Sequence, residues 1–479
     1  MSPIGIIIII AVYFLALYVI SHITGKNASN STFFIGNRKS PWYLVAFGMI
    51  GATLSGVSFI SVPGWVGSTQ FSYLQMVLGY FAGYLVIGTV LMPVYYKMQL
   101  TSIYGYLNNR FGAYSYKTGA SFFLLSRTIG AALRLFLSAG VLQFVLFGRL
   151  GIPFFITVLI IILFIYLFTY KGGIRTVVFT DTIQTAFMLA SLVGCVFVLS
   201  HRLNMDFGKM VSTIYDSSFS KTFFFADWND KRHFLKQFIS GAFIAIAMTG
   251  LDQDLMQKNL SCKNLKDAQK NMFWFTITLL PVNLLFLSLG AMLYIFSAKT
   301  GFPLPAHSDE LFPAIATQNF MPAIFSTIFI LGLISSTYSS ADSALTSLTT
   351  SVTLDILGAQ KKGEEKLAQT RKRVHIFMAL VLVILILVFK IANNQSVISA
   401  VFTMAGYTYG PLLGLYAFGF FTKWEVRDKL TPIIAIASPL TCIALNYALH
   451  WKLGYEILLI NGLLTFAGLY LIKQRNRIA

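Results

Sequence analysis

The most constraining feature of this sequence is a succession of apolar stretches, each long enough to cross a lipid bilayer as a single helix. About 20 apolar residues complete one crossing. Because lipid offers no water to unpaired peptide groups, only helices and closed barrels can span it. Thirteen such stretches are present, at residues 4–23, 42–67, 70–98, 117–149, 151–170, 178–200, 234–256, 271–297, 322–357, 373–391, 397–421, 430–450 and 454–472. The sequence therefore predicts an all-α polytopic membrane protein with 13 transmembrane helices.

The charged residues support this interpretation and orient the chain. Only 11% of the 479 residues are charged, whereas soluble domains average about 25%. Lys and Arg number 36 against 17 Asp and Glu, and they concentrate in alternate loops, including 258–270, to which we assign Lys258, and 361–373. Cytoplasmic loops carry such an excess, so we expect the N-terminus outside and the C-terminus in the cytoplasm. The basic residues thus fit a lipid bilayer and require no nucleic acid partner.

A few charged side chains fall inside the predicted spans. They are Arg127 and Arg134 in the fourth span, Asp181 in the sixth and Asp342 in the ninth, with Asp252 and Asp254 near the cytoplasmic end of the seventh. An ionisable group at the bilayer centre costs about 2.5–3.5 kcal/mol even on insertion scales, so each group needs a partner or a water-filled cavity. Structural ion pairing is one interpretation, and a polar permeation pathway that uses these charges is the one we favour.

Two of the spans contain residues that interrupt helices. The second span has five glycines and a proline between residues 48 and 67, and the seventh carries Gly241 and Gly250. Interrupted helices at membrane depth line cavities in transporters, although small residues also permit close helix packing. The two interrupted spans are five helices apart and run in opposite directions. We therefore expect one domain over 1–479, with inverted repeats at 42–200 and 234–421, a peripheral helix at 4–23 and two more at 430–472.

The ninth span is rich in hydroxyl groups. One stripe of this helix recurs at i, i+3, i+4 and i+7, and consists of Ser336, Ser339, Ser340 and Ser343, with Asp342 beside it. Hard cations such as Na⁺ take oxygen ligands, so a hydroxyl stripe facing the free carbonyls of a broken helix would suit Na⁺. Alternatively, these hydroxyls bond only to carbonyls of their own helix or to neighbouring helices. No histidine or cysteine spacing typical of a transition metal is present, which leaves Na⁺ as the only metal expected.

At these residues the chain resembles the sodium/solute symporter family. Four segments carry the resemblance, which covers nearly the whole chain: GATLSGVSFISVPGWVG (51–67), GGIRTVVFTDTIQ (172–184), DQDLMQKNLSCKNLKDAQK (252–270) and SSADSALTSLTTSVTLDIL (339–357). The resemblance implies a LeuT-type fold, a 5+5 inverted repeat of helices 2–6 and 7–11 with discontinuous helices 2 and 7. It also implies a sodium site formed by the backbone carbonyls of Gly51, Leu54 and Ser336 and the hydroxyls of Ser339 and Ser340.

Some members of this family hold a second sodium ion deeper toward the cytoplasm. By position, its ligands here would come from Asp181, Ser339, Asp342 and Ser343. Relatives often carry a hydroxyl or small residue at the position of Asp342, so this aspartate departs from the family pattern. Asp342 would then strengthen a cation site, carry a proton, or neutralise Arg127 or Arg134.

Residues of the fourth and seventh spans, compared with those of the family, indicate the class of substrate. Sugar-transporting relatives carry polar and aromatic residues before the glycine that matches Gly250, whereas this chain has only Ala245–Thr249 there. Arg134 lies halfway along the fourth span, and an arginine fork matches a carboxylate bidentately. We therefore favour a small organic anion such as sialic acid or a monocarboxylate over a neutral sugar, polyol or amino acid. The expected substrate contacts are Thr53, Ser55, Ser58, Gln75, Arg134 and Met248.

The predicted activity is sodium-coupled symport by alternating access, with Na⁺ as the coupling ion and without an organic cofactor. We expect a monomer in the bacterial inner membrane. A passive channel or facilitator is the main alternative, and it would conduct substrate without regard to a sodium gradient. An enzyme is not expected, because the sequence shows no constellation of nucleophile and base.

Overall fold

The computed structural model describes residues 3–26, 28–317, 321–392, 397–448 and 454–474. Its helices are α1 (Pro3–Thr24), α2 (Asn30–Ile35), α3 (Trp42–Thr69), α4 (Tyr73–Val86), α5 (Met92–Lys97), α6 (Gly105–Arg110), α7 (Ala113–Leu142), α8 (Phe154–Thr169), α9 (Ile174–Arg202), α10 (Phe207–Tyr215), α11 (Phe234–Ala245), α12 (Gln253–Leu260), α13 (Leu265–Thr300), α14 (Leu311–Ala316), α15 (Ala323–Ser351), α16 (Glu364–Ala392), α17 (Val397–Phe421), α18 (Thr431–Ala448) and α19 (Ile457–Leu471). Two short strands, β1 (Glu425–Val426) and β2 (Lys473–Gln474), pair antiparallel.

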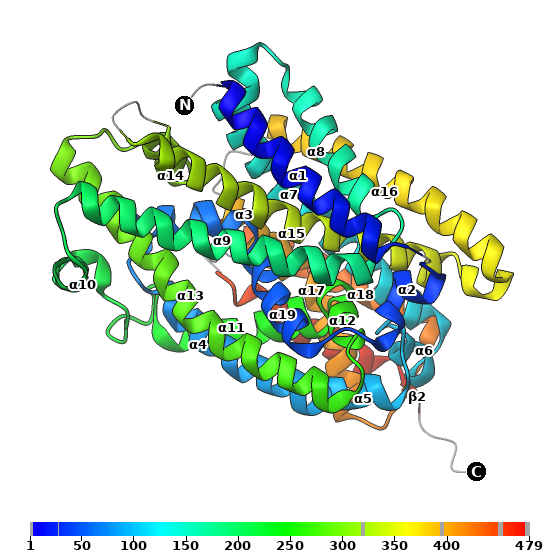
Figure 1. Ribbon diagram of the computed structural model, residues 1–479. Helices are drawn as coiled ribbons and strands as arrows, with labels where there is room; N and C mark the ends of the chain where they lie inside the picture. Colours follow the sequence, from blue (N-terminus) through cyan, green and yellow to red (C-terminus); the bar gives the residue numbers. More distant parts are fainter. Residues whose placement is uncertain (1–2, 27, 318–320, 393–396, 449–453, 475–479) are drawn as a thin grey trace.

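The helices form a bundle around three central members. In Figure 1, α3, α9 and α15 lie in the middle of the bundle, and each of the three packs against the other two. Helices α1, α8 and α16 cover one flank, and α4, α11 and α13 cover the opposite flank. The short helices α10 and α14 lie at one end of the long axis, while α2, α5, α6 and β2 lie at the other (Figure 1).

The predicted spans all coincide with helices, but their number is only partly supported. Within the described residues, nine helices are long and apolar enough to cross a membrane, and ten if the bent pair α11 and α12 is counted as one span. Of the remaining three predicted spans, α8 and α19 are apolar but shorter, and α17 lies outside this set. The count of thirteen therefore stays a prediction.

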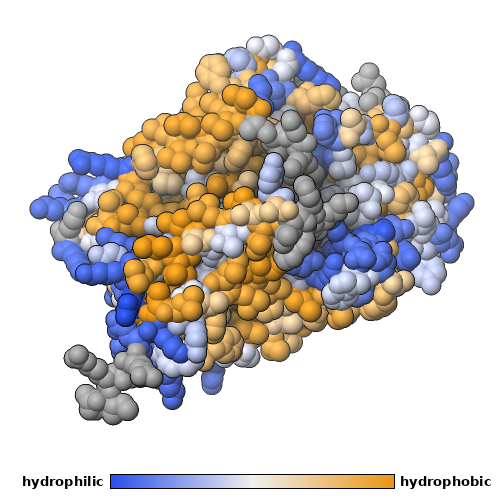
Figure 2. All heavy atoms as spheres, turned by 180° about the vertical axis from the view of Figure 1, so that it is seen from behind, coloured by the Kyte–Doolittle hydropathy of each residue, from blue (hydrophilic) through white to orange (hydrophobic). Residues whose placement is uncertain are grey.

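The outer surface of the bundle matches the low charge content. Figure 2 shows hydrophobic residues over most of the middle of one face, with hydrophilic residues gathered toward its ends. The exposed apolar side chains include Leu85, Leu163, Phe197, Ile384 and Leu463. Apolar side chains that point outward are compatible with hydrocarbon, because a bilayer replaces water as their solvent.

The second span breaks inside α3, as its glycine and proline content predicts. Ser55 has φ 37° and ψ 174°, a non-helical conformation that separates two helical halves within Trp42–Thr69. Positive φ is costly for a residue with a Cβ atom. Strain of this kind persists where the surrounding structure fixes it and often marks a functional site. The break frees backbone carbonyls that a continuous helix would use internally.

The seventh span also breaks. Helix α11 ends in a π-helical turn, Ile246–Gly250, and α12 then departs at an angle of 65°. Asp252 caps α12, because its carboxylate accepts a hydrogen bond of 2.8 Å from the backbone N–H of Asp254. Every residue of α12 is buried, so the bend turns this polar segment into the bundle instead of out into a loop.

Candidate functional site

A cavity lies beside the break in α3. Helix α3 contributes Thr53, Ser55 and Ser58 to its wall, and α11 with the following turn contributes Ala245 and Met248. Helices α4, α7, α12, α13 and α17 also line it, with Tyr73, Tyr80, Tyr84, Arg127, Arg134, Leu255, Leu279, Asn283, Val401 and Phe402. Five of the six residues predicted to contact a substrate therefore meet at one cavity. Its volume is about 80 Å³.

The two arginines of α7 both line this cavity, but they differ in whether they have an ion-pair partner. Arg127 is buried and forms an ion pair with Asp254 of α12. Arg134 is half-buried and lines the cavity without an ion-pair partner among the described residues. An intramembrane guanidinium without a carboxylate partner is expensive, so the position of Arg134 favours an anionic ligand at this point.

Aromatic side chains separate the cavity from a second, outer hollow. Trp65 packs on Phe402 with ring centroids 6.4 Å apart and on Tyr73 with centroids 6.2 Å apart. Beyond them lies a hollow of about 320 Å³, lined in part by Lys231, Arg232 and the tip of α19. The inner cavity is thus covered on this side by a small number of aromatic rings.

The predicted first sodium ligands lie where α3 and α15 touch. An added Cβ atom on Gly51 would come within 3.2 Å of the Ser339 hydroxyl and would collide with Thr185, so only glycine permits this approach. The hydroxyls of Ser336 and Ser340 donate to Leu333 O at 3.0 Å and Thr337 O at 3.1 Å. Their protons are therefore engaged, while each oxygen keeps lone pairs to offer a cation.

Many other hydroxyls of α15 serve their own helix. Those of Thr346, Ser347, Thr349 and Thr350 each donate to a carbonyl three or four residues earlier. These four residues lie outside the stripe of Ser336, Ser339, Ser340 and Ser343, and their hydroxyls satisfy buried polar groups within the helix.

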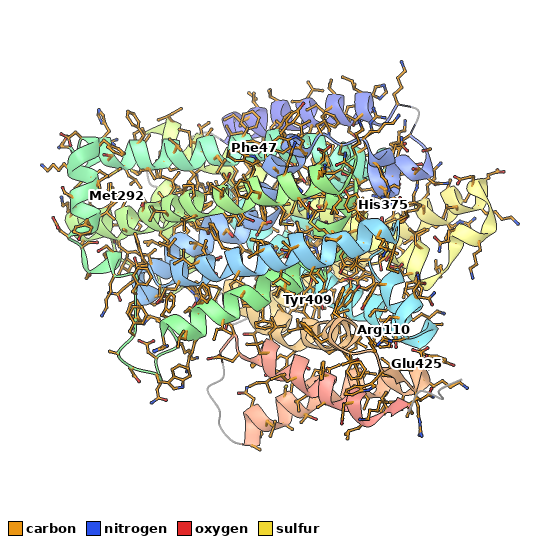
Figure 3. All side chains as sticks on the ribbon, turned by 90° about the horizontal axis from the view of Figure 1, so that it is seen from below. Phe47, Arg110, Met292, His375, Tyr409 and Glu425 are labelled. Atoms are coloured by element: carbon orange, nitrogen blue, oxygen red, sulfur yellow. The ribbon has the colours of Figure 1, made fainter. Side chains whose placement is uncertain are left out.

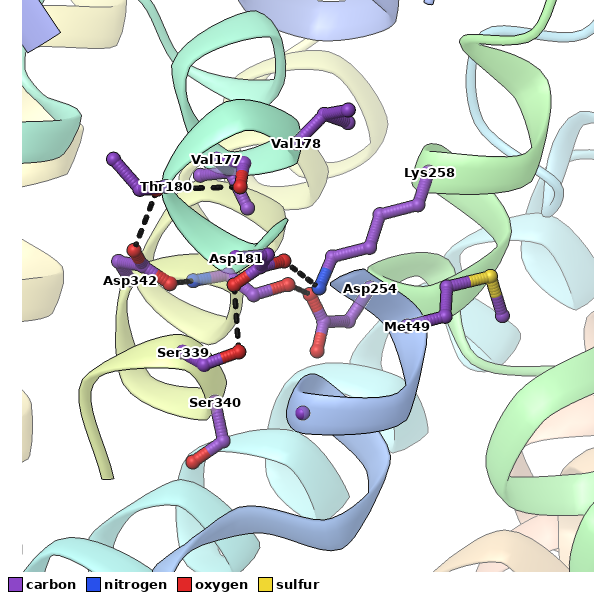
Figure 4. Close-up of polar contacts among 12 residues, drawn as sticks. Met49, Val177, Val178, Thr180, Asp181, Asp254, Lys258, Ser339, Ser340 and Asp342 are labelled. Carbon is purple, nitrogen blue, oxygen red and sulfur yellow. Dashed lines mark hydrogen bonds and ion pairs between the residues drawn. The ribbon is translucent and has the colours of Figure 1, made fainter. Parts of the chain in front are cut away.

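The predicted second sodium ligands form a charged cluster with a lysine that the sequence had placed elsewhere. Figure 4 shows Lys258 of α12 reaching Asp181 of α9, with Ser339 and Asp342 on the adjacent turns of α15. Lys258 Nζ lies 2.5 Å from Asp181 Oδ2, and Ser339 Oγ donates to Asp181 Oδ1 at 2.7 Å. Asp342 accepts from the backbone N–H of Ser343 at 2.6 Å and from Thr180 Oγ1 at 3.3 Å.

Two expectations about charge are wrong. Lys258 is not a loop residue, because it is 1% exposed and paired with Asp181 inside the bundle. Asp342 does not neutralise Arg127 or Arg134, since neither arginine forms an ion pair with it in the part of the chain that the structure describes. The intramembrane charges instead pair through α12, whose Asp254 and Lys258 reach Arg127 and Asp181.

Side chains of neighbouring helices bind the bent seventh span near the cavity. Tyr409 of α17 donates a hydrogen bond to Asp252, and Ser343 of α15 donates one to Asp254. Tyr104 Oη donates to Leu251 O at 3.0 Å. Figure 3 places Tyr409 midway along the molecule, between Met292 toward one end and Arg110 and Glu425 toward the other. This network therefore lies at the middle depth of the bundle.

Gln75 is the one predicted substrate contact that does not line the cavity. Its amide donates to Arg232 O at 2.8 Å and Ser72 O at 3.3 Å, and its carbonyl accepts from the Phe224 N–H at 3.2 Å. Gln75 is fully buried, and these contacts tie the loop before α11 to the start of α4. The apolar residues around Gln75 in the sequence indicate that it is buried. They do not indicate its hydrogen-bond partners Arg232 and Phe224, which are about 150 residues away in sequence.

Sequence reasoning missed several residues of the site. Three tyrosines of α4, at positions 73, 80 and 84, line the cavity because a spacing of seven and four places them on one helical face. Asn283 of α13 and Phe402 of α17 complete the wall. The tyrosine spacing could have been recognised in the sequence, whereas Asn283 and Phe402 lie within apolar runs without a local signal.

Comparisons with known proteins identify the family of this chain. The model of the sodium:solute symporter family matches residues 33–426. The sodium/sialic acid symporter NanT of Aliivibrio fischeri is 25% identical over 460 residues, which cover 92% of this chain and 88% of NanT. The sodium/sialic acid symporter SiaT of Proteus mirabilis is 21% identical over 448 residues, which cover 90% of this chain and 88% of SiaT.

Solved structures show the same architecture. A substrate-bound, outward-open Na⁺-coupled sialic acid symporter superposes with a TM-score of 0.84 at 19% identity, over 97% of each chain. Mhp1, a nucleobase-cation-symport-1 family transporter, superposes with a TM-score of 0.61 at 13% identity, over 92% of this chain and 93% of that one. These similarities show a shared polytopic transporter fold. With the family model covering most of its length, this chain belongs to the sodium:solute symporter family.

Proposed function

We propose that this protein imports a small organic anion bearing a carboxylate, and that Na⁺ entry drives the import by alternating access. The observation that carries the proposal is Arg134, a guanidinium that faces the central cavity beside the break in α3 and has no ion-pair partner among the described residues. A carboxylate would accept two parallel hydrogen bonds from it. This contact would also offset the cost of a charge at membrane depth.

Other groups of the cavity support an oxygen-rich ligand. The Thr53 hydroxyl is buried and has no hydrogen-bond partner within the described residues. Asn283 and the tyrosines of α4 add further donors and acceptors. Two relatives are named as sialic acid symporters, which supports a sugar acid. The volume of about 80 Å³ is below the 300–1,000 Å³ of pockets that enclose drug-sized ligands, so the cavity would have to widen to enclose a sugar acid.

The coupling ion would bind between α3 and α15. We assign it to the carbonyls of Gly51, Leu54 and Ser336 and the hydroxyls of Ser339 and Ser340. The approach of α3 to α15 at Gly51 supports this assignment. Bound Na⁺ would hold the two helices together and complete the pocket, and a four-helix core would then rock against the rest of the protein to open the cavity inward.

The proposal is tested by counterflow and uptake in proteoliposomes. Purified protein is reconstituted and offered radiolabelled N-acetylneuraminate, pyruvate, propionate, glucose or proline, with an inward gradient of Na⁺ or of K⁺. We expect concentrative uptake of an acid that requires the Na⁺ gradient. Uptake indifferent to Na⁺ would identify a passive facilitator. Sodium-driven uptake of glucose or proline alone would refute the anionic substrate.

Arg134→Lys tests the carboxylate contact. A lysine keeps the charge but offers no planar fork, and a hydrogen bond to a charged group contributes about 1.5–3 kcal/mol. We expect KM for the acid to rise roughly 10- to 100-fold with an unchanged Na⁺ requirement. Arg175→Lys is the matched control, because Arg175 is exposed at the start of α9. Normal KM in Arg134→Lys would remove the argument for a carboxylate.

A further inference from the structure

Among the described residues, the ion pair between Lys258 and Asp181 is the most deeply buried pair of a lysine and a carboxylate. The Lys258 side chain is 1% exposed, and that of Asp181 is 0% exposed. Lys258 belongs to α12 and Asp181 to α9, so the ion pair joins the inner half of the broken seventh span to one of the three central helices. A residue that looks like part of a basic loop in the sequence thus supplies a cation in the interior.

The position of the ammonium group is within the cluster that would form a second sodium site. The Asp181 carboxylate forms an ion pair with Lys258 Nζ at 2.5 Å and accepts a hydrogen bond from Ser339 Oγ at 2.7 Å. Asp342 lies on the next turn of α15 and faces Thr180 of α9. Lys258 Nζ thus contacts Asp181, the carboxylate that Ser339 also binds, while Asp342 lies one turn further along α15 and forms no ion pair with Lys258 within the described residues. Carboxylate and hydroxyl oxygens are the ligands that a hard cation takes.

An ammonium group and Na⁺ compete for such a position. Both are compact monovalent cations, and the lysine ammonium behaves as a point charge. Buried carboxylates require a cation nearby, because leaving one unpaired is strongly destabilising. A cation tethered to the chain has a high effective concentration at its own site, so free Na⁺ is at a disadvantage while Lys258 remains in place.

We propose that Lys258 is a built-in substitute for a second coupling ion. Its ammonium occupies the cation position at Asp181, beside Ser339 and one turn from Asp342, so the transporter couples to one Na⁺, and loss of the ammonium opens this position to a second Na⁺. This inference rests on the proposed function in one respect, namely the sodium site between α3 and α15. The neighbouring carboxylate of Asp254 already has a guanidinium partner in Arg127, and it also accepts a hydrogen bond from Ser343.

The number of bound ions decides the question without knowledge of the substrate. Equilibrium binding of ²²Na⁺ to the purified full-length protein gives the ratio of bound Na⁺ to protein at saturation, with choline as the balancing cation. We expect a ratio of one in the wild type and two in Lys258→Met. Lys263→Met removes a lysine from the exposed segment after α12 and is the matched control, with an expected ratio of one.

Two double variants locate the ions. In Lys258→Met with Asp342→Asn, the cluster loses a carboxylate, so the ratio should return to one. In Lys258→Met with Ser340→Ala, the site between α3 and α15 is weakened, so at the Na⁺ concentration that just saturates the wild type the ratio should also fall to one. If Lys258 is purely structural, the ratio in Lys258→Met stays at one.

Contradictory outcomes separate this inference from the proposed function. A ratio of two in the wild type, or of one in a folded Lys258→Met protein, overturns the substitute cation and leaves sodium coupling intact. A ratio of zero in the wild type overturns both proposals. The wild-type measurement needs no substitution, so it tests the inference even if Lys258→Met does not fold.

Discussion

Ser340 offers the cleanest test of the sodium site at the scale of a single residue. Its hydroxyl proton is donated within α15, to Thr337 O, so removing the hydroxyl breaks no contact between helices. A hydrogen bond or ligand contact to a charged group contributes about 1.5–3 kcal/mol. We expect Ser340→Ala to raise the Na⁺ concentration for half-maximal uptake roughly 10- to 100-fold, measured in proteoliposomes at fixed substrate.

The control for this substitution lies seven residues along the same helix. Ser347 is also fully buried, and its hydroxyl donates to Ala344 O at 2.9 Å. Ser347→Ala removes the same atom from the same kind of local bond, away from the proposed site. Its Na⁺ dependence should match the wild type. If both variants keep normal Na⁺ dependence, the hydroxyl of Ser340 does not bind the ion.

At the scale of elements, the close approach of α3 to α9 and α15 depends on Gly51. Its backbone N–H donates to Thr185 Oγ1 at 3.2 Å, and a methyl group there would collide with that hydroxyl. Overpacking of this kind costs about 1–3 kcal/mol. We expect Gly51→Ala to lower the thermal unfolding temperature and to weaken Na⁺ binding at least tenfold, both measured on purified protein.

A control glycine and a compensating substitution test whether the effect of Gly51→Ala comes from this contact. Gly140 of α7 has open space around it, so Gly140→Ala should leave both measurements unchanged. Adding Thr185→Ala to Gly51→Ala removes the oxygen that collides and should restore part of the Na⁺ affinity. A Gly51→Ala protein with normal affinity would show that the contact between α3 and α15 does not set the ion site.

The sequence predicted these elements unevenly, for physical reasons. Glycine and proline in 48–67 indicated a break in α3, because both residues are costly in helix interiors, yet nothing local selected Ser55 as the residue with positive φ. The hydroxyl stripe of α15 was visible from its spacing alone. The role of α12 was not, because hydropathy assigns a polar segment to a loop, while a 65° bend turns it inward.

The pairing of intramembrane charges illustrates the same limit. Two arginines and two aspartates balance in number, so pairing among them was a reasonable expectation. The structure instead supplies Asp254 and Lys258 from α12. Which charges meet is decided by tertiary contacts over 127 and 77 residues of sequence. Periodicity within one helix carries no information about contacts at this range.

At the scale of the whole molecule, the two proposals together fix the net charge that moves in one transport cycle. A carboxylate that carries one negative charge and a single Na⁺ sum to zero, and Lys258 stays with the protein. Transport should therefore be electroneutral, although both partners are charged. A membrane potential of 100 mV contributes about 2.3 kcal/mol for each net charge that crosses, equivalent to roughly a 50-fold change in accumulation.

This expectation is tested by imposing a potential on proteoliposomes with valinomycin and a K⁺ gradient while the Na⁺ gradient is held fixed. Steady-state accumulation of a monovalent acid by the wild type should not change when the interior is made negative, because no net charge crosses. In Lys258→Met, a second Na⁺ accompanies each acid, one net positive charge enters, and accumulation should rise with the potential. Wild-type accumulation that increases with an interior-negative potential would mean that more than one Na⁺ moves with each acid, so that Lys258 does not take the place of a coupling ion.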